Sequence, residues 1–147
     1  MDEHTSDHEP LTKFLEDTKD YHLPSGPIKV KAFHPSNKYG TISVFRIQDA
    51  SVEDIWLIAN EFVAPQRKDF TGIYCARADL VASEVRSTGL DVKCEPSKHP
   101  RHADIIGWVT SSKEVSSEEA QNELREKRNE YAAKLFQIAT LVLREFP

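Results

Sequence analysis

Apolar residues alternate with polar ones, or cluster in short runs, at several places along the chain, and each place predicts a β-strand. Thr41 to Gln48 is rich in β-branched and aromatic residues, which favour extended structure. Ile28 to Phe33 alternates apolar residues with lysine, as an edge strand does. The remaining runs are Ile73 to Ala78, Leu90 to Cys94 and Ala103 to Val109. Together they predict a small sheet of four to five strands, mostly antiparallel.

Shorter segments between these runs have apolar residues at helical spacing. The first covers residues 11–18. The second begins at Ser51, which can cap a first turn, and ends before Pro65. The third is capped by Asp79 and ends at Gly89, because glycine tolerates the left-handed conformation found at helix ends. Short helices are therefore expected beside the sheet.

The C-terminal segment carries the clearest helix pattern. Ser116-x-x-Glu119 is a capping box, and neither Gly nor Pro occurs from Ser117 to about Glu145. The first half of this segment is charged and the second half is apolar on nearly all sides. A helix that is apolar on all sides must be covered on all sides. We expect either a second copy or partner protein to cover it, or the helix to thread its own core; the candidate interface residues have the spacing of a seven-residue repeat and are Tyr131, Leu135, Ile138 and Val142.

These elements predict an α+β fold, in which the sheet packs against the long C-terminal helix and one or two shorter helices. The length of 147 residues suits one domain, which we place at residues 11–147. Residues 1–10 are acidic and almost without apolar side chains, so we expect a disordered tail. We expect Trp56 and Trp108 to lie in the core, because large aromatic side chains dominate burial.

Charge and composition narrow the choice of partners. The net charge is −5, and residues 1–20 carry seven acidic residues against two lysines, so the rest of the chain is balanced. A balanced chain predicts no basic surface for nucleic acid. No apolar run approaches the roughly 18 residues of a membrane span, and the first residues lack an export signal. Two cysteines, Cys75 and Cys94, are too few for a disulfide framework, so we expect a cytoplasmic protein.

Two arginines interrupt apolar faces of the predicted strands, namely Arg46 and Arg77. A half-buried guanidinium needs a carboxylate, phosphate or carbonyl partner. Asp104, with His102 on the same strand face, can supply a carboxylate. If the sheet brings these strands together, Arg46, Arg77, His102 and Asp104 form a cluster that binds a small anionic ligand. The alternative is a structural network of ion pairs.

Other chemistry has weaker signals. Cys94, His99 and His102, with His34 as a fourth donor, are candidate zinc ligands, although their spacing matches no standard zinc site. The nucleophile elbow, the phosphate-binding loop and the dinucleotide-binding motif are all missing from the sequence. The sequence therefore predicts no cofactor and does not favour an enzyme.

Segments from three parts of the chain carry a resemblance. Ile42 to Arg46 contains an S-V-x-R strand, Cys75 to Leu80 contains A-R-A, and Pro100 to Trp108 contains R-H-A-x-I-x-G-W. In this order they resemble a family of short, uncharacterised bacterial proteins, over about residues 40–109. Val109 stands where such proteins often place proline. The resemblance implies bacterial origin and a shared fold, and by analogy an accessory part in a multi-component system such as defence against phage.

Two hypotheses for the function follow. The first is a non-enzymatic protein-interaction or assembly module of a bacterial multi-component system, which associates with a second copy or a partner protein through its C-terminal helix. The second is a small-molecule or nucleotide-binding protein, or a weak hydrolase, that uses the cluster of two arginines, His102 and Asp104. Convergence of those side chains in one open pocket would favour the second hypothesis.

Overall fold

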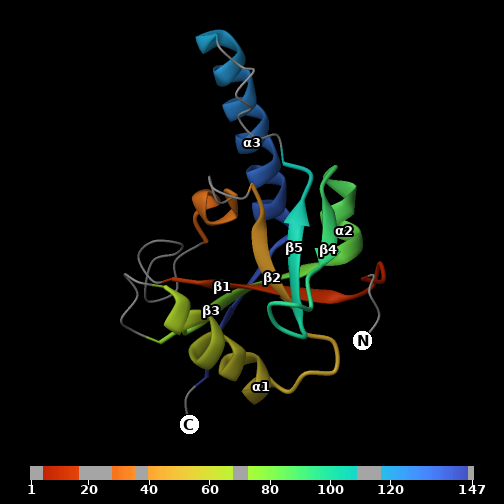
Figure 1. Cartoon of the computed structure of the whole chain (residues 1–147), viewed down its shortest axis with the longest axis vertical. Coiled ribbons are helices and arrows are strands. Elements are labelled where there is room, and N and C mark those ends of the chain that lie inside the picture. Colours follow the sequence, from red (N-terminus) through yellow and green to blue (C-terminus); the bar gives the residue numbers. More distant parts are fainter. Residues whose placement is uncertain (1–4, 17–27, 36–39, 68–72, 109–116, 146–147) are drawn as a thin grey trace.

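The computed structural model describes residues 5–16, 28–35, 40–67, 73–108 and 117–145. Within these ranges, six strands form one antiparallel sheet in the order β4-β5-β2-β1-β3-β6 (Figure 1). The strands are β1 (Pro10–Leu15), β2 (Ile42–Arg46), β3 (Ala76–Val81), β4 (Asp91–Cys94), β5 (His102–Ile106) and β6 (Thr140–Leu143). The helices are η1 (Val30–Phe33), α1 (Val52–Leu57) with its continuations η2 (Ile58–Val63) and η3 (Ala64–Gln66), α2 (Ala82–Ser87) and α3 (Glu118–Ile138). The predicted α+β fold is confirmed, with a strand more than expected.

Helices cover both faces of the sheet. The central strands carry apolar side chains on each face, and both sets must be covered. On the face that we call the α3 face, strand residues such as Leu11, Val44 and Ala78 pack against η1, α2 and α3. On the opposite face, which we call the α1 face, Phe14 and Phe45 pack against α1 and η2. The molecule therefore has three layers, with two separate apolar cores.

The two halves of α3 differ in what they contact. Ala132 and Leu135 are fully buried in the core of the α3 face, whereas residues 118–130 are exposed or half-buried. Figure 1 shows this first half extending away from the sheet. The helix is capped by Ser117, whose hydroxyl accepts from the Ala120 N–H (3.1 Å), one residue later than the predicted capping box. Ser51 caps α1 in the same way, as predicted, by accepting from the Asp54 N–H (3.0 Å).

Two predictions near the N-terminus are wrong. Residues 11–15 belong to strand β1 and not to a helix. β1 lies between β2 and β3 and is buried on both faces, so its apolar residues do not alternate and their spacing also fits a helix. The run from Ile28 to Phe33 contains a short 3-10 helix, η1, after a single bridge residue at Ile28.

The beginning of the chain also differs from the expected disordered tail. Thr5 and Glu9 are buried, and the backbone of this segment bonds to the start of α2 through Ala82 N–H to Glu9 O (3.0 Å). Residues 1–4 lie outside the described residues. The acidic composition predicted disorder, but one of these acidic residues, Glu9, is buried and contacts Arg46.

The C-terminal helix is shorter than its pattern predicted. It ends at Ile138, and Thr140–Leu143 forms β6, which pairs with β3. A run of threonine, leucine and valine suits both states, and the hydrogen bonds offered by the edge of β3 favour the strand. Val142 is therefore a strand residue, and of the other candidate interface residues, Leu135 is fully buried in the chain's own core. Tyr131 and Ile138 are half-buried and pack against the same core.

Remaining differences in the fold are small. β3 begins later than predicted, at Ala76, and Asp79 lies within this strand and does not cap α2. Gly89 follows α2 with the expected positive φ of 104°. Trp56 and Trp108 are buried, as predicted.

Candidate functional site

Arg46 lies on the α3 face and has a different carboxylate partner from the one expected. Its Nε contacts Glu9 Oε1 (2.5 Å), and its second guanidinium nitrogen contacts Glu9 Oε2 (3.1 Å). Both side chains are almost completely buried. Asp104, the expected partner, is on the α1 face, because it is paired with Ser43 and not with Val44. Arg46 and Asp104 are thus on opposite sides of the sheet.

Arg77 lies on the α1 face but far from His102 and Asp104. Its Nε donates to Asp79 Oδ1 (3.0 Å), and its guanidinium lies over the Trp56 ring, 5.3 Å from the centroid. Strands β1 and β2 separate β3 from β5, which corresponds to about 14 Å at the usual spacing of strands. The predicted four-residue cluster is therefore not formed, and the structure favours the alternative of separate ion pairs.

His102 and Asp104 do lie together, beside the exposed Ser43. His102 Nε2 is 3.4 Å from Asp104 Oδ1 and 3.2 Å from Ser43 Oγ. A catalytic triad needs the carboxylate on one ring nitrogen and the hydroxyl on the other, whereas here both approach Nε2. Burial lowers the pKa of His102 and outweighs the Asp104 carboxylate, which raises it. The imidazole is therefore neutral at pH 7 without being placed to activate Ser43.

The candidate zinc site does not form. Cys94 is paired with Ala103 and lies on the α3 face, whereas His102 lies on the α1 face. Burial raises the pKa of the Cys94 thiol, which disfavours the thiolate that zinc requires. The His99 ring packs against Phe62, with 4.8 Å between centroids. Among the residues that the structure describes, no three His, Cys, Asp or Glu side chains are grouped to hold a metal ion.

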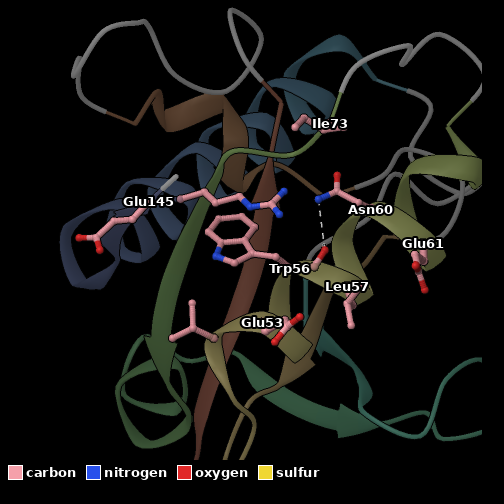
Figure 2. A pocket seen from close by; sticks show the side chains of 9 residues that line it. Glu53, Trp56, Leu57, Asn60, Glu61, Ile73 and Glu145 are labelled. Atoms are coloured by element: carbon pink, nitrogen blue, oxygen red, sulfur yellow. Dashed lines mark hydrogen bonds between the residues drawn. The ribbon is translucent and has the colours of Figure 1, made fainter. Parts of the chain in front are cut away.

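A pocket of about 500 Å³ lies on the α1 face, at the edge of the sheet. Figure 2 shows the Trp56 indole at its centre, surrounded by Leu57, Ile73 and Glu145. Of the four exposed large apolar side chains in the described ranges, three line this pocket: Val52 (64% exposed), Leu57 (45%) and Ile73 (55%). Exposed apolar side chains that gather around one hollow mark an interaction site.

The floor of the pocket is held by polar contacts. The Asn60 side chain donates to the Trp56 carbonyl (3.2 Å) and accepts from the Tyr74 N–H (2.6 Å). It therefore ties the helix to the segment before β3. The Arg144 guanidinium lies over the Trp56 ring at 5.8 Å from the centroid. Asn60 belongs to η2, a π-helical stretch, and such stretches often occur at functional sites.

Strand β6 adjoins the pocket and is the last strand of the sheet. Arg144 N–H donates to the Cys75 carbonyl (2.8 Å), and Val142 is paired with Arg77. In an antiparallel ladder the residues that bond to a neighbour alternate, so Leu141 and Leu143 direct their N–H and C=O groups away from β3. Among the residues that the structure describes, the outer edge of β6 has no paired strand in the sheet, and it lies next to the pocket.

The sequence contained a signal for part of this site. Val52 and Leu57 fall outside the apolar face of the helix predicted after Ser51, which is formed by Ile55, Trp56, Ala59, Phe62 and Val63. Apolar residues on the outer face of a helix indicate a contact surface. Ile73, Arg144 and Glu145 come from distant parts of the chain, and only the fold brings them to the same place.

The chain matches no protein-family model, no curated protein and no solved structure. The resemblance to short bacterial proteins thus stays a prediction. None of the described helices has the length and apolar character needed to cross a membrane. The fold and the site define an α+β protein with an apolar surface pocket beside an open sheet edge.

Proposed function

We propose that this chain is a non-enzymatic protein-interaction module that binds an extended segment of a partner as an added strand on β6. The observation that carries the proposal is the position of the open edge at Leu141 and Leu143, directly beside a pocket lined by three exposed apolar side chains. Strand addition of this kind obtains its affinity from backbone hydrogen bonds and its specificity from pockets for alternate side chains.

The composition of β6 supports this proposal. Natural edge strands are usually protected from pairing by charged residues, proline or bulges. The residues of β6 are Thr140, Leu141, Val142 and Leu143, none of which provides such protection. Leu143 is 39% exposed, although it belongs to the sheet. A partner strand would cover this side chain and pair with the edge.

The proposal keeps the interaction module of the first hypothesis but places its contact surface on β6 and not on the C-terminal helix. The second half of α3 is packed against its own chain, so the C-terminal strand replaces the C-terminal helix as the contact. The separation of Arg46, Arg77 and the His102–Asp104 pair weighs against a shared anion site. The arrangement around His102 Nε2 likewise weighs against a hydrolase.

A proline substitution at the edge tests the proposal. Peptides that bind the full chain would first be selected from a displayed library of random 12-residue sequences. Leu143→Pro removes an outward N–H without removing a bond to β3, whereas Leu143→Ala removes the side chain and keeps the N–H. We expect Leu143→Pro to weaken peptide binding at least about tenfold, because one hydrogen bond contributes about 1 kcal/mol and the ring obstructs the added strand.

Leu143→Ala is the matched control and should lose clearly less binding than Leu143→Pro, since it keeps the backbone N–H that would pair with the added strand. Circular dichroism and thermal unfolding would show that both variants are folded. Equal loss of binding in the two variants would mean that only side chains matter, and would contradict strand addition. Failure to select any peptide that responds to Leu143→Pro, together with a monomer in sedimentation at micromolar concentration, would overturn the proposal.

A further inference from the structure

We infer that the partner segment carries basic residues two positions away from the apolar residue that enters the pocket. This inference rests on the proposed function and specifies the chemistry of its ligand. It starts from the charges around the pocket, where three exposed carboxylates, Glu53, Glu61 and Glu145, surround the apolar centre. None of the three has an ion-pair partner among the described residues.

The cations near the pocket are already engaged. Arg77 is paired with Asp79 and packed on one side of Trp56. Arg144 also lies over the Trp56 ring. Both guanidinium groups are therefore held at the indole, whereas the carboxylates lie at the rim. A ligand that reaches the rim meets negative charge, so electrostatic complementarity favours a basic segment.

The spacing of the carboxylates defines the pattern further. Glu53, Leu57 and Glu61 are four residues apart along the helix formed by α1 and η2, so a carboxylate lies close to one helical turn on either side of Leu57, roughly 6 Å away on the α1 side. In a strand, side chains two residues apart are on the same face and about 6.6 Å from each other. A basic-x-apolar-x-basic segment thus matches the row of acidic, apolar and acidic side chains.

A second copy of this chain fits the site less well. If two β6 strands paired antiparallel about Val142, Arg144 of the second copy would lie opposite Thr140. That position is at the far end of β6 from Arg144 and Glu145, which border the pocket. In addition, each copy carries a net charge of −5. The occupant that we infer is therefore a basic segment of another protein.

The test compares two synthetic peptides that are identical except for the charged positions. The first is acetyl-Thr-Lys-Thr-Leu-Thr-Lys-Thr-Val-Thr-amide, and the second has glutamate in place of both lysines. At low salt we expect the full chain to bind the lysine peptide at least about tenfold more tightly, with a smaller difference at about 0.5 M salt because ions screen exposed charges. In Glu53→Lys/Glu61→Lys the preference should reverse in favour of the glutamate peptide.

Glu123→Lys/Glu126→Lys is the matched control, because it changes the net charge equally on the exposed part of α3 and should leave the preference unchanged. Binding of both peptides without preference, still abolished by Leu143→Pro, would overturn this inference and leave the proposed function standing. A dimer that Leu143→Pro abolishes would place a second copy at the edge and also overturn it. If neither peptide binds, library selection is empty as well and the chain is a monomer, both proposals fail.

Discussion

Glu9 and Arg46 form a buried, two-pronged ion pair between the segment that precedes β1 and the end of β2. Their side chains are 3% and 6% exposed. Glu9 Oε2 also accepts from the Ser6 N–H (3.2 Å), so the carboxylate organises the chain before the sheet begins. The pair links a polar N-terminal segment to the core, because a buried guanidinium cannot lose its charge and must keep a partner.

Removal of one member of this pair should be costly. We expect Glu9→Ala to lower the free energy of unfolding by about 3–5 kcal/mol, since it leaves a buried charge uncompensated, and Glu9→Met/Arg46→Met to recover much of that loss. Urea denaturation would measure both values. Asp7→Ala is the control, because the Asp7 side chain is 70% exposed in its pair with Arg86 and this pair should contribute less than about 1 kcal/mol. Equal effects of Glu9→Ala and Asp7→Ala would show that the Glu9 pair has no special role.

Stability should fall as the pH falls below neutral. Burial lowers the pKa of His102, and also those of His34 and His99, each from an ordinary value of 6.5. The unfolded chain therefore takes up protons near pH 6.5 that the folded chain does not yet bind, which favours unfolding by up to about 1.4 kcal/mol per pH unit for each histidine. We expect His102→Gln to show a smaller loss of unfolding free energy between pH 7 and pH 5. A slope identical to that of the unmodified protein would contradict this assignment.

Gly89 and Gly107 both have a positive φ, 104° and 97°, but their surroundings differ. A Cβ at Gly89 would lie 3.2 Å from Tyr131 Cε1, whereas at Gly107 the nearest atom would be at 3.6 Å. Alanine at either position should cost about 1–2 kcal/mol for the backbone, and at Gly89 an additional amount for the contact with α3. In a Tyr131→Ala background, the extra cost of Gly89→Ala should disappear from the thermal unfolding data. Persistence of the extra cost there would rule out the contact as its origin.

Asn60 should be important for the pocket because it supplies both a donor and an acceptor. We expect Asn60→Ala to destabilise the chain by about 1–3 kcal/mol, since the Tyr74 N–H would lose its acceptor. Asn60→Asp keeps an oxygen for that N–H and should cost less. Urea denaturation followed by tryptophan fluorescence, to which Trp56 in the pocket and Trp108 both contribute, would measure the two losses of unfolding free energy. A larger loss in Asn60→Asp than in Asn60→Ala would contradict the role of the acceptor.

The parts of the fold that could be predicted are those with a clear local pattern. β2, β4 and β5 lie within predicted runs or within a residue of them, and Ser51 caps its helix as predicted. β4 alternates exposed and buried residues, β2 is rich in β-branched and aromatic residues, and the helix after Ser51 has a capping side chain close in sequence. The information needed to predict them lies within a few residues.

The elements that were predicted wrongly depend on distant parts of the chain. β1 is buried on both faces because β2 and β3 flank it, which removes the alternation that would identify a strand. Thr140–Leu143 becomes a strand because β3 has a free edge more than 60 residues earlier in the sequence. An apolar run of this length has the same local preference in either state.

The sequence determined the α+β class, most of the strands and the burial of both tryptophans, because patterning and side-chain size act locally. Tertiary structure alone decided which charges meet. Arg46 pairs with Glu9 across 37 positions, on the face opposite to Asp104, and the pocket unites α1, Ile73 and the residues after β6. The sequence shows that a guanidinium in a strand needs an anionic partner and that Leu57 lies outside the apolar face of its helix. Which groups each of them contacts depends on the order of the strands and on the face to which each side chain points.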